Sequence, residues 1–314
     1  MTAALLVAVL VPTAIMIAVW AYHERTHKSG WIDVAWTFAV GLGAVGGAVW
    51  PFDGVEARAG LYAAMAAAWS VRLGWHLAKR SAGHPDDPRY AKMREGWGAS
   101  SPVKMFGLLL IQAAAASVLA VCVVLVARSP AGALGLADYA AAALFVVALI
   151  GEATADAQMR AFQADPANKG KICDVGLWGW SRHPNYFFEW LSWCAVALGA
   201  LADPSWLPGW IALAAPLMML HLLLNMSGVP PLEAHMRRTR GAAWEAYVAR
   251  VSRFVPAPPK ATQDRSAPKR AVKPKAPVKP KAPAKAKAAP AAAAPARPKR
   301  KPRPKPKTSG KPRK

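Results

Sequence analysis

Two long stretches without a charged side chain set the main limit on how this chain can fold. Residues 1–22 contain no Asp, Glu, Lys or Arg, and neither do residues 105–127. A helix that crosses a bilayer needs about 20 consecutive apolar residues, so both stretches predict membrane-spanning helices. The first has no charged leader and no clear small-residue cleavage site, which favours a retained helix over a signal peptide.

Apolar segments continue along most of the chain, which is 54% hydrophobic. They predict an all-α, polytopic membrane protein with about seven transmembrane helices in one domain, residues 1–256, followed by a disordered tail, residues 257–314. The helices are expected near residues 2–21, 31–50, 58–78, 105–127, 134–158, 187–202 and 205–227. The sixth is short, which indicates a tilted or partly interfacial segment.

Basic residues are distributed unevenly between the expected loops. The loops after the first, third and fifth helices carry many Lys and Arg residues, whereas the other loops carry only Arg58 and Arg128. Cytoplasmic loops of membrane proteins are enriched in Lys and Arg. We therefore expect an N-terminus outside the cytoplasm, a cytoplasmic C-terminal tail, and a polar ligand site that opens to the cytoplasm.

The tail accounts for most of the formal net charge of +23. Residues 260–314 hold 20 Lys and Arg residues and one acid, whereas residues 1–259 hold 20 basic and 16 acidic residues. A segment rich in Lys, Pro and Ala has too few large apolar groups to fold. Its charge predicts non-specific binding to anionic membrane lipid, with non-specific nucleic-acid binding as the alternative.

Several charged residues fall inside the expected helices. In "WSVRLGWHLAKR" (69–80), Arg72 shares a helix face with His76, Lys79 and Arg80. Snorkelling to the interface explains Lys79 and Arg80, but Arg72 lies two helical turns deeper in the membrane. An ionisable group at that depth usually faces a partner or a cavity, so both a ligand role and an anchoring role remain open for Arg72.

A second set of charges ends the fifth expected helix, "GEATADAQMRAF" (151–162). Glu152, Asp156 and Arg160 follow i, i+4, i+8 spacing. A stabilising pair between Asp156 and Arg160 is one interpretation. Glu152, however, lies in the membrane half of the helix, where an isolated carboxylate would be costly. This position favours a polar partner for Glu152.

The stretch "WGWSRHPNYFFEW" (178–190) places polar residues just before an apolar run. Pro184 disfavours helical geometry at His183, so we expect a new helix near Asn185, where Asn would be a good N-cap. Glu189 would lie one turn above Asn185 and face the same neighbour. Arg182 and His183 are either ligand-binding residues or interfacial anchors.

The chemistry of these residues suits a phosphorylated aromatic cofactor, because Arg binds phosphate and Asn or Asp can bond amide and ribose groups. No glycine-rich nucleotide motif follows a strand, and no metalloprotease or nucleophile-elbow motif occurs. The three cysteines show no disulfide framework and no metal-ligand spacing. The segment 227–256 is amphipathic, which predicts an interfacial helix or one that closes over a ligand.

Three motifs together carry a resemblance to a known family. "GLWGWSRHPNYFFEW", the upstream Glu152 and Asp156, and the ending "SGVPPLE" with "AYVARVSRFVP" resemble the DUF1295 branch of the steroid 5α-reductase C-terminal superfamily. "WSVRLGWHLAKR" and "DDPRYAKMRE" fit the same branch. The resemblance covers roughly residues 30–256.

The resemblance implies a seven-helix membrane enzyme that uses NADPH from the cytoplasmic side to reduce a carbon–carbon double bond conjugated to a carbonyl in a lipophilic, sterol-like or isoprenoid substrate. It also implies a set of residues that contact the cofactor and a carboxylic residue that polarises the substrate carbonyl. The implied cofactor-contacting positions are Asp156, Lys171, Asn185 and Glu189, with Glu152 and Arg72 as additions; the implied carbonyl-polarising position is Asp33.

The chain departs from the steroid reductases at two positions. The tyrosine that they use on the third helix is replaced near Trp69, and Phe188 stands where relatives often have Gly. Isoprenylcysteine and phospholipid methyltransferases, which use S-adenosylmethionine, carry a similar RHP-x-Y motif and form the alternative; their usual Glu pair is here a single Glu233. A non-catalytic membrane anchor for the cationic tail is the third hypothesis.

Overall fold

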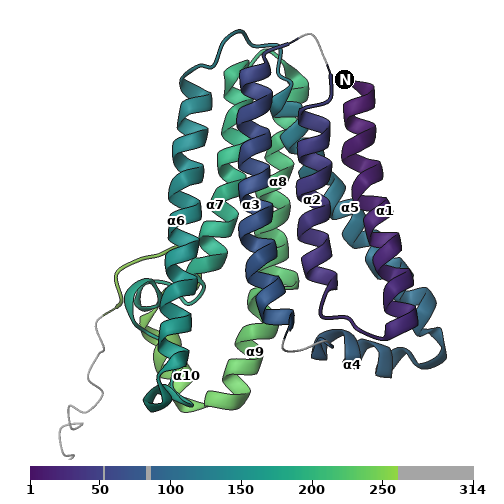
Figure 1. The fold of residues 1–314 in the computed structure, drawn as a ribbon. Helices are drawn as coiled ribbons and strands as arrows, with labels where there is room; N and C mark the ends of the chain where they lie inside the picture. Colours follow the sequence, from purple (N-terminus) through teal and green to yellow (C-terminus); the bar gives the residue numbers. More distant parts are fainter. Residues whose placement is uncertain (52–53, 83–85, 261–314) are drawn as a thin grey trace, which may run out of the picture. The chain divides into compact units, whose positions relative to one another are not determined.

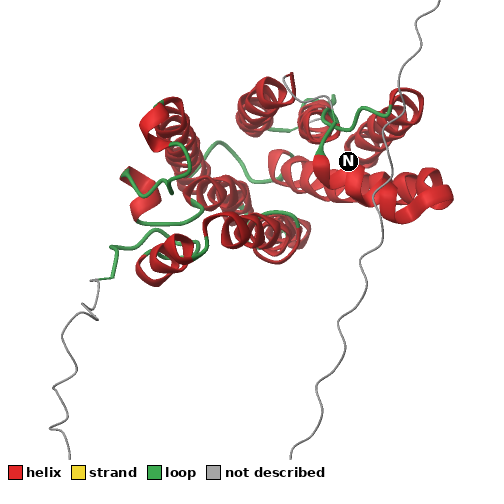
Figure 2. Ribbon diagram, turned by 90° about the horizontal axis from the view of Figure 1, so that it is seen from below, coloured by secondary structure: helices red, strands yellow, loops and turns green. Residues whose placement is uncertain are grey.

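The computed structural model describes residues 1–51, 54–82 and 86–260. In this part of the chain all regular elements are helices, as Figure 1 and Figure 2 show. The all-α prediction is therefore confirmed. The tail expected from residue 257 lies outside the described residues from position 261 onward.

Each of the expected membrane helices coincides with helical structure. The first six correspond to α1 (Thr2–Thr26), α2 (Ile32–Ala48), α3 (Glu56–Ala82), α5 (Ser101–Ala127), α6 (Leu136–Ala164) and α7 (Pro184–Leu198), which continues as η4 (Gly199–Ala202). The seventh is a succession of three short elements, with a proline at the start of the first and another inside the second: η5 (Leu207–Leu213), α8 (Ala214–His221) and the π-helical η6 (Leu222–Met226).

The described residues contain 4 helical segments long and apolar enough to cross a bilayer, and the chain is an integral membrane protein. These segments are Thr2–Thr26, Arg89–Ala127, Leu136–Ala164 and Leu207–Arg240. α2 is apolar but has only 17 residues. The count of seven spans stays a prediction.

Glycine allows α1 and α2 to approach closely. A Cβ atom on Gly47 of α2 would lie 2.8 Å from the carbonyl oxygen of Ala4 in α1. Such a contact is too short for any side chain, so glycine is required where the two helices meet. The hydrophobic core then extends through α2, α3, α5, α7 and α8.

A buried ion pair joins α3 to α6 at the end of the bundle where the N-terminus lies (Figure 1). Arg58 donates to Asp138 at 3.0 and 3.1 Å and to the carbonyl oxygens of Ala131 and Ala133 at 2.6 and 3.0 Å. Tyr62 also donates to Asp138, at 3.2 Å. Arg58 and Asp138 are both 0% exposed, so this clamp is part of the core.

Three shorter helices lie at the opposite end of the bundle: α4 (Pro88–Trp97), α9 (Val229–Arg240) and α10 (Ala242–Arg250) (Figure 1). α4 begins after Asp87, whose side chain accepts a hydrogen bond from the Arg89 backbone at 2.8 Å. An aspartate followed by proline is a typical helix start, so this helix was visible in the sequence although a loop was expected there.

Candidate functional site

A buried polar cluster lies between α3, α6 and α7. Arg72 of α3 forms ion pairs with both Glu152 and Asp156 of α6. His76, one turn along α3 from Arg72, lies 3.4 Å from Asp156. Glu152 is 4% exposed and Asp156 6% exposed. The i, i+4 spacing on each helix therefore places these side chains on facing surfaces.

Glu189 joins this cluster from α7. Trp69 donates its indole N–H to both carboxylate oxygens of Glu189, at 3.0 and 2.9 Å, and Trp193 donates to one of them at 3.0 Å. The two indole rings meet edge to face, with centroids 4.9 Å apart. Glu189 also lies within electrostatic range of Arg72 and Glu152.

The cluster thus holds three carboxylates around one guanidinium. Of the groups in it, the Oε2 atom of Glu152 is buried and has no hydrogen-bond partner among the described residues. A buried acceptor without a donor costs about 1–3 kcal/mol. Glu152 Oε2 is therefore available to accept a hydrogen bond from a ligand that reaches it.

A pocket with a volume of 430 Å³ lies at the end of the bundle that carries α9 and α10. The last turns of α6, the loop 165–173, the residues before α7, and both short helices form its walls. Its cationic and aromatic lining residues are Lys169, Lys171, Arg182, Arg240, Trp178, Trp244 and Tyr247. The volume is within the range of about 300–1,000 Å³ of small-molecule sites.

Arg182 and His183 form the inner wall of this pocket. Arg182 donates to Glu233 of α9 at 2.9 Å and to the Val251 carbonyl oxygen at 2.9 Å. The Nε2 atom of His183 lies 3.1 Å from Glu233, and its ring stacks on Tyr186 with centroids 5.6 Å apart. At 8% and 1% exposure, both residues are buried within the protein.

The environment of His183 also determines its charge. Burial lowers the pKa of His183, and the Glu233 carboxylate only partly opposes this shift. The imidazole is therefore neutral near neutral pH. Its Nδ1 atom is buried and has no hydrogen-bond partner among the described residues, and the same holds for Nε1 of Trp244. Both residues line the pocket, so a polar ligand there would find unused hydrogen-bonding groups.

The amphipathic segment 227–256 forms two helices rather than one. Gly241 has a positive φ of 50° and separates α9 from α10. The apolar face of α10 packs on Ile172 and Met236, and the Tyr247 hydroxyl donates to the Trp178 carbonyl oxygen at 2.6 Å. The segment therefore covers the pocket.

The remaining predicted residues are placed as follows. Lys171 is exposed at the pocket. Asn185 is not the N-cap of α7, which begins at Pro184 with His183 before it, and its side chain forms no hydrogen bond with another described residue. Asp33 forms none of its described polar contacts with the cluster. It pairs with Arg89 of α4 at 2.5 Å and accepts a hydrogen bond from the Tyr90 hydroxyl at 3.2 Å.

Some site residues were not found by sequence reasoning. The donors to Glu189 come from Trp69, which is 120 positions away, and from Trp193, one turn along the same helix. Only the i, i+4 spacing of Glu189 and Trp193 could have suggested a contact. Glu233 was noted in the sequence only as the counterpart of the methyltransferase Glu pair, and nothing in the sequence indicated that it binds both Arg182 and His183.

The comparisons with known proteins place these residues within one matched region. A family model described as "Protein of unknown function (DUF1295)" matches residues 19–251. No curated protein and no solved structure matches the chain. The matched region includes the whole cluster and the whole pocket.

Proposed function

The chain belongs to the DUF1295 family, and on that premise we propose that it is a membrane oxidoreductase that uses NADPH. The proposed reaction reduces a carbon–carbon double bond conjugated to a carbonyl in a lipophilic substrate. The reaction type rests on the resemblance of the motifs at 176–190 and 227–256 to the steroid 5α-reductase superfamily. The site geometry supports it as follows.

The observation that carries the proposal is the pocket below the polar cluster. Lys169, Lys171 and Arg240 surround it together with Trp178 and Trp244. Lysine and arginine bind phosphate groups, and indole rings stack on flat heteroaromatic rings. The phosphate-bearing part of a dinucleotide would therefore fit this lining, and its polar atoms could satisfy Nδ1 of His183 and Nε1 of Trp244.

The polar cluster is the proposed site for the nicotinamide end. Asp156 and Met159 lie three residues apart on α6, about 4.5 Å along the helix axis, and Met159 already lines the pocket. Arg72, Glu152 and Asp156 do not line the pocket themselves, and we propose that the bound ligand extends from Met159 along α6 toward them. The unpartnered Oε2 atom of Glu152 can accept a hydrogen bond from a carboxamide.

NADPH, when bound, supplies a hydride, and the residues of this chain bind and orient it. Arg72 fixes the two carboxylates of α6, and the Trp69 and Trp193 indoles fix Glu189. We retain Asp33 as the proposed carbonyl-binding residue. Because a carboxylate only accepts hydrogen bonds, Asp33 would have to separate from Arg89 and take up a proton before it could donate to a substrate carbonyl oxygen.

We also propose the orientation that the loop charges predict, with the N-terminus outside and the pocket open to the cytoplasm. The pocket, α4, α9 and α10 all lie at the end opposite the N-terminus (Figure 1), which is the end with the basic loops. In this orientation the basic tail would leave α10 on the cytoplasmic side, where anionic lipid headgroups would attract it.

A thermal-shift titration tests the proposal. Purified protein in detergent is expected to be stabilised by NADPH and not by S-adenosylmethionine. Lys171→Ala should weaken the NADPH response, while Lys92→Ala, an exposed lysine of α4 outside the pocket, should leave it unchanged. Stabilisation by S-adenosylmethionine alone would favour the methyltransferase hypothesis. If neither compound changes the Tm, and deletion of residues 260–314 abolishes the cellular phenotype while the remaining protein still folds, the membrane-anchor hypothesis would be favoured.

A further inference from the structure

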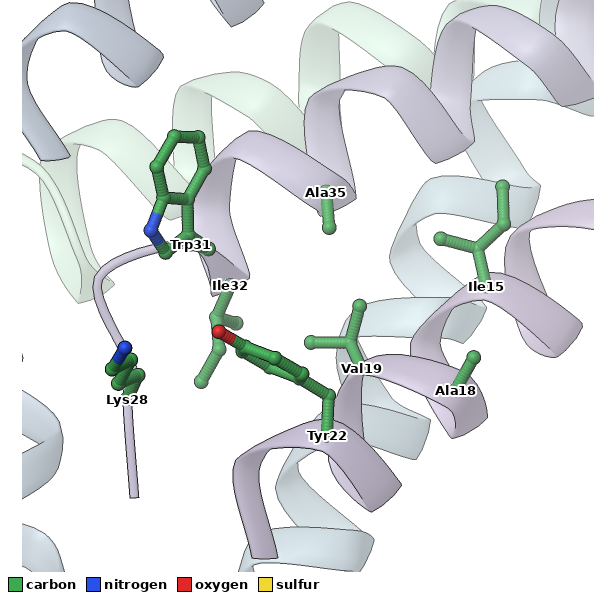
Figure 3. Close-up of a pocket in the computed structure, with 8 residues that line it drawn as sticks. All are labelled: Ile15, Ala18, Val19, Tyr22, Lys28, Trp31, Ile32 and Ala35. Atoms are coloured by element: carbon green, nitrogen blue, oxygen red, sulfur yellow. The ribbon is translucent and has the colours of Figure 1, made fainter. Parts of the chain in front are cut away.

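An apolar groove runs between α1 and α2 (Figure 3), and none of the residues that line it has a role in the proposed reaction. Ile15, Ala18 and Val19 of α1 form one wall, and Ile32 and Ala35 of α2 form the other. Its volume is 280 Å³. This value lies just below the range of about 300–1,000 Å³ that is typical of small-molecule sites.

The two ends of the groove differ in chemistry. Tyr22, Lys28 and Trp31 gather at the end where the loop joins α1 to α2, whereas only apolar side chains lie at the other end (Figure 3). Tyr22 is 45% and Trp31 39% exposed. Exposed Tyr and Trp beside a lysine mark the level of the lipid headgroups in membrane proteins.

The length of the groove agrees with a position that extends from the headgroups into one leaflet. Ile15 and Tyr22 are seven residues apart, which is about 10 Å along a helix. One leaflet of the hydrocarbon core is about 15 Å thick, half of the bilayer core. The groove therefore begins at the headgroups and ends within the acyl chains of the same leaflet. Among the described residues Lys28 has no ion-pair partner, so its charge is available at the headgroup end.

We propose that this groove binds one acyl chain of an anionic phospholipid, with the headgroup phosphate held by Lys28. The apolar walls match the chain, and Lys28 at the headgroup end matches a phosphate whose negative charge no headgroup cation balances. A helix of a second copy of this chain is the alternative occupant, and a dimer that Ala35→Trp dissociates would reveal it. The proposal does not depend on the reductase assignment.

Native mass spectrometry of the full-length protein tests the proposal. The protein is reconstituted with equal amounts of phosphatidylglycerol and phosphatidylcholine that carry the same acyl chains, and the retained lipids are counted. Wild type is expected to retain one phosphatidylglycerol molecule. Ala35→Trp fills the groove and should lose it, whereas Val71→Trp, at a 61% exposed position of α3, should keep it.

A charge variant gives an independent readout if Ala35→Trp fails to fold. Lys28→Gln should lower the preference for phosphatidylglycerol by about fivefold, since one lysine near the headgroups contributes about 1 kcal/mol. Lys104→Gln, an exposed lysine outside the groove, should not change it. Equal lipid retention by folded Ala35→Trp and wild type, an unchanged preference in Lys28→Gln, or a dimer that Ala35→Trp dissociates would overturn the proposal.

Discussion

Replacing Arg72 with methionine removes the only guanidinium in the described part of the polar cluster and keeps a side chain of similar length. Glu152 and Asp156, whose side chains are 5% and 7% exposed, would then lie buried without the arginine that forms ion pairs with both. Breaking a buried ion pair by removing one partner costs about 3–5 kcal/mol. We expect about 3 kcal/mol, because the Arg72 side chain is 19% exposed and His76 remains 3.4 Å from Asp156.

The assay is thermal unfolding in detergent, with and without NADPH. A loss of about 3 kcal/mol corresponds to a decrease in Tm of about 6–12 °C for a domain of this size. Arg72→Met is also expected to lose the NADPH-induced rise in Tm, since Arg72 lies at the proposed nicotinamide end. The double variant Arg72→Met/Glu152→Gln removes one of the two unpaired carboxylates. It should recover part of the stability, but not the NADPH-induced rise in Tm.

Arg58→Met is the matched control. It breaks the fully buried pair with Asp138 at the other end of the bundle and should cost a similar or larger amount, about 3–5 kcal/mol. The NADPH-induced rise in Tm should persist in this variant, which separates loss of stability from loss of binding. A Tm of Arg72→Met within about 2 °C of wild type would refute the buried network, and an equal loss of the NADPH response in Arg58→Met would refute the assignment of that response to the cluster.

Three further predictions concern the groups around the cluster and pocket. Trp69→Phe removes the donor to both Glu189 oxygens and should destabilise the protein by about 1–3 kcal/mol. Trp193→Phe removes a donor to one Glu189 oxygen and should cost less, so Trp69→Phe should have the lower Tm of the two variants. Burial lowers the pKa of His183 below 6.5, so below that pH the unfolded chain binds more protons than the folded protein. The free energy of unfolding should therefore decrease as the pH drops below about 6.5. His183→Gln should flatten this part of a curve of Tm against pH. Tyr247→Phe removes a 2.6 Å hydrogen bond to a backbone carbonyl and should lower stability by about 1 kcal/mol, measured by the same unfolding assay, with a weaker NADPH response because α10 covers the pocket.

The sequence was informative wherever a property depends on residues close together along the chain. Uncharged runs predicted the helices, because their length and composition suffice for a membrane span. The i, i+4 spacing placed Glu152 and Asp156 on one face of α6, as found. Helix boundaries were predicted less accurately. Asn185 was expected as the cap of α7, yet the helix already begins at Pro184, whose fixed φ suits the first helical position.

Partners that are distant along the chain were not predictable. Arg182 binds Glu233, which lies 51 positions away, and Glu189 accepts from Trp69, which lies 120 positions away. Such contacts depend on which helices become neighbours, and hydrophobic periodicity gives the buried face of a helix without identifying the helix that covers it. The cost of a buried charge predicted that Glu152 needs a partner, but it could not identify Arg72 as that partner.

The contact between Trp69 and Glu189 gives a physical meaning to one departure from the steroid reductases. Those enzymes carry a tyrosine near this position. A phenol hydroxyl can donate and accept hydrogen bonds and can transfer its proton, whereas an indole N–H only donates a hydrogen bond. In this chain the indole donates to Glu189, a position at which the resemblance implies a cofactor contact. With both Glu189 oxygens engaged by indoles, the polar contacts to a ligand would come from Glu152, whose Oε2 atom has no partner among the described residues. A proton for the proposed reduction would then have to come from a group other than residue 69, and the Tyr90 hydroxyl, held between Asp33 and Gln112 at 3.2 and 3.0 Å, is positioned to exchange one with Asp33.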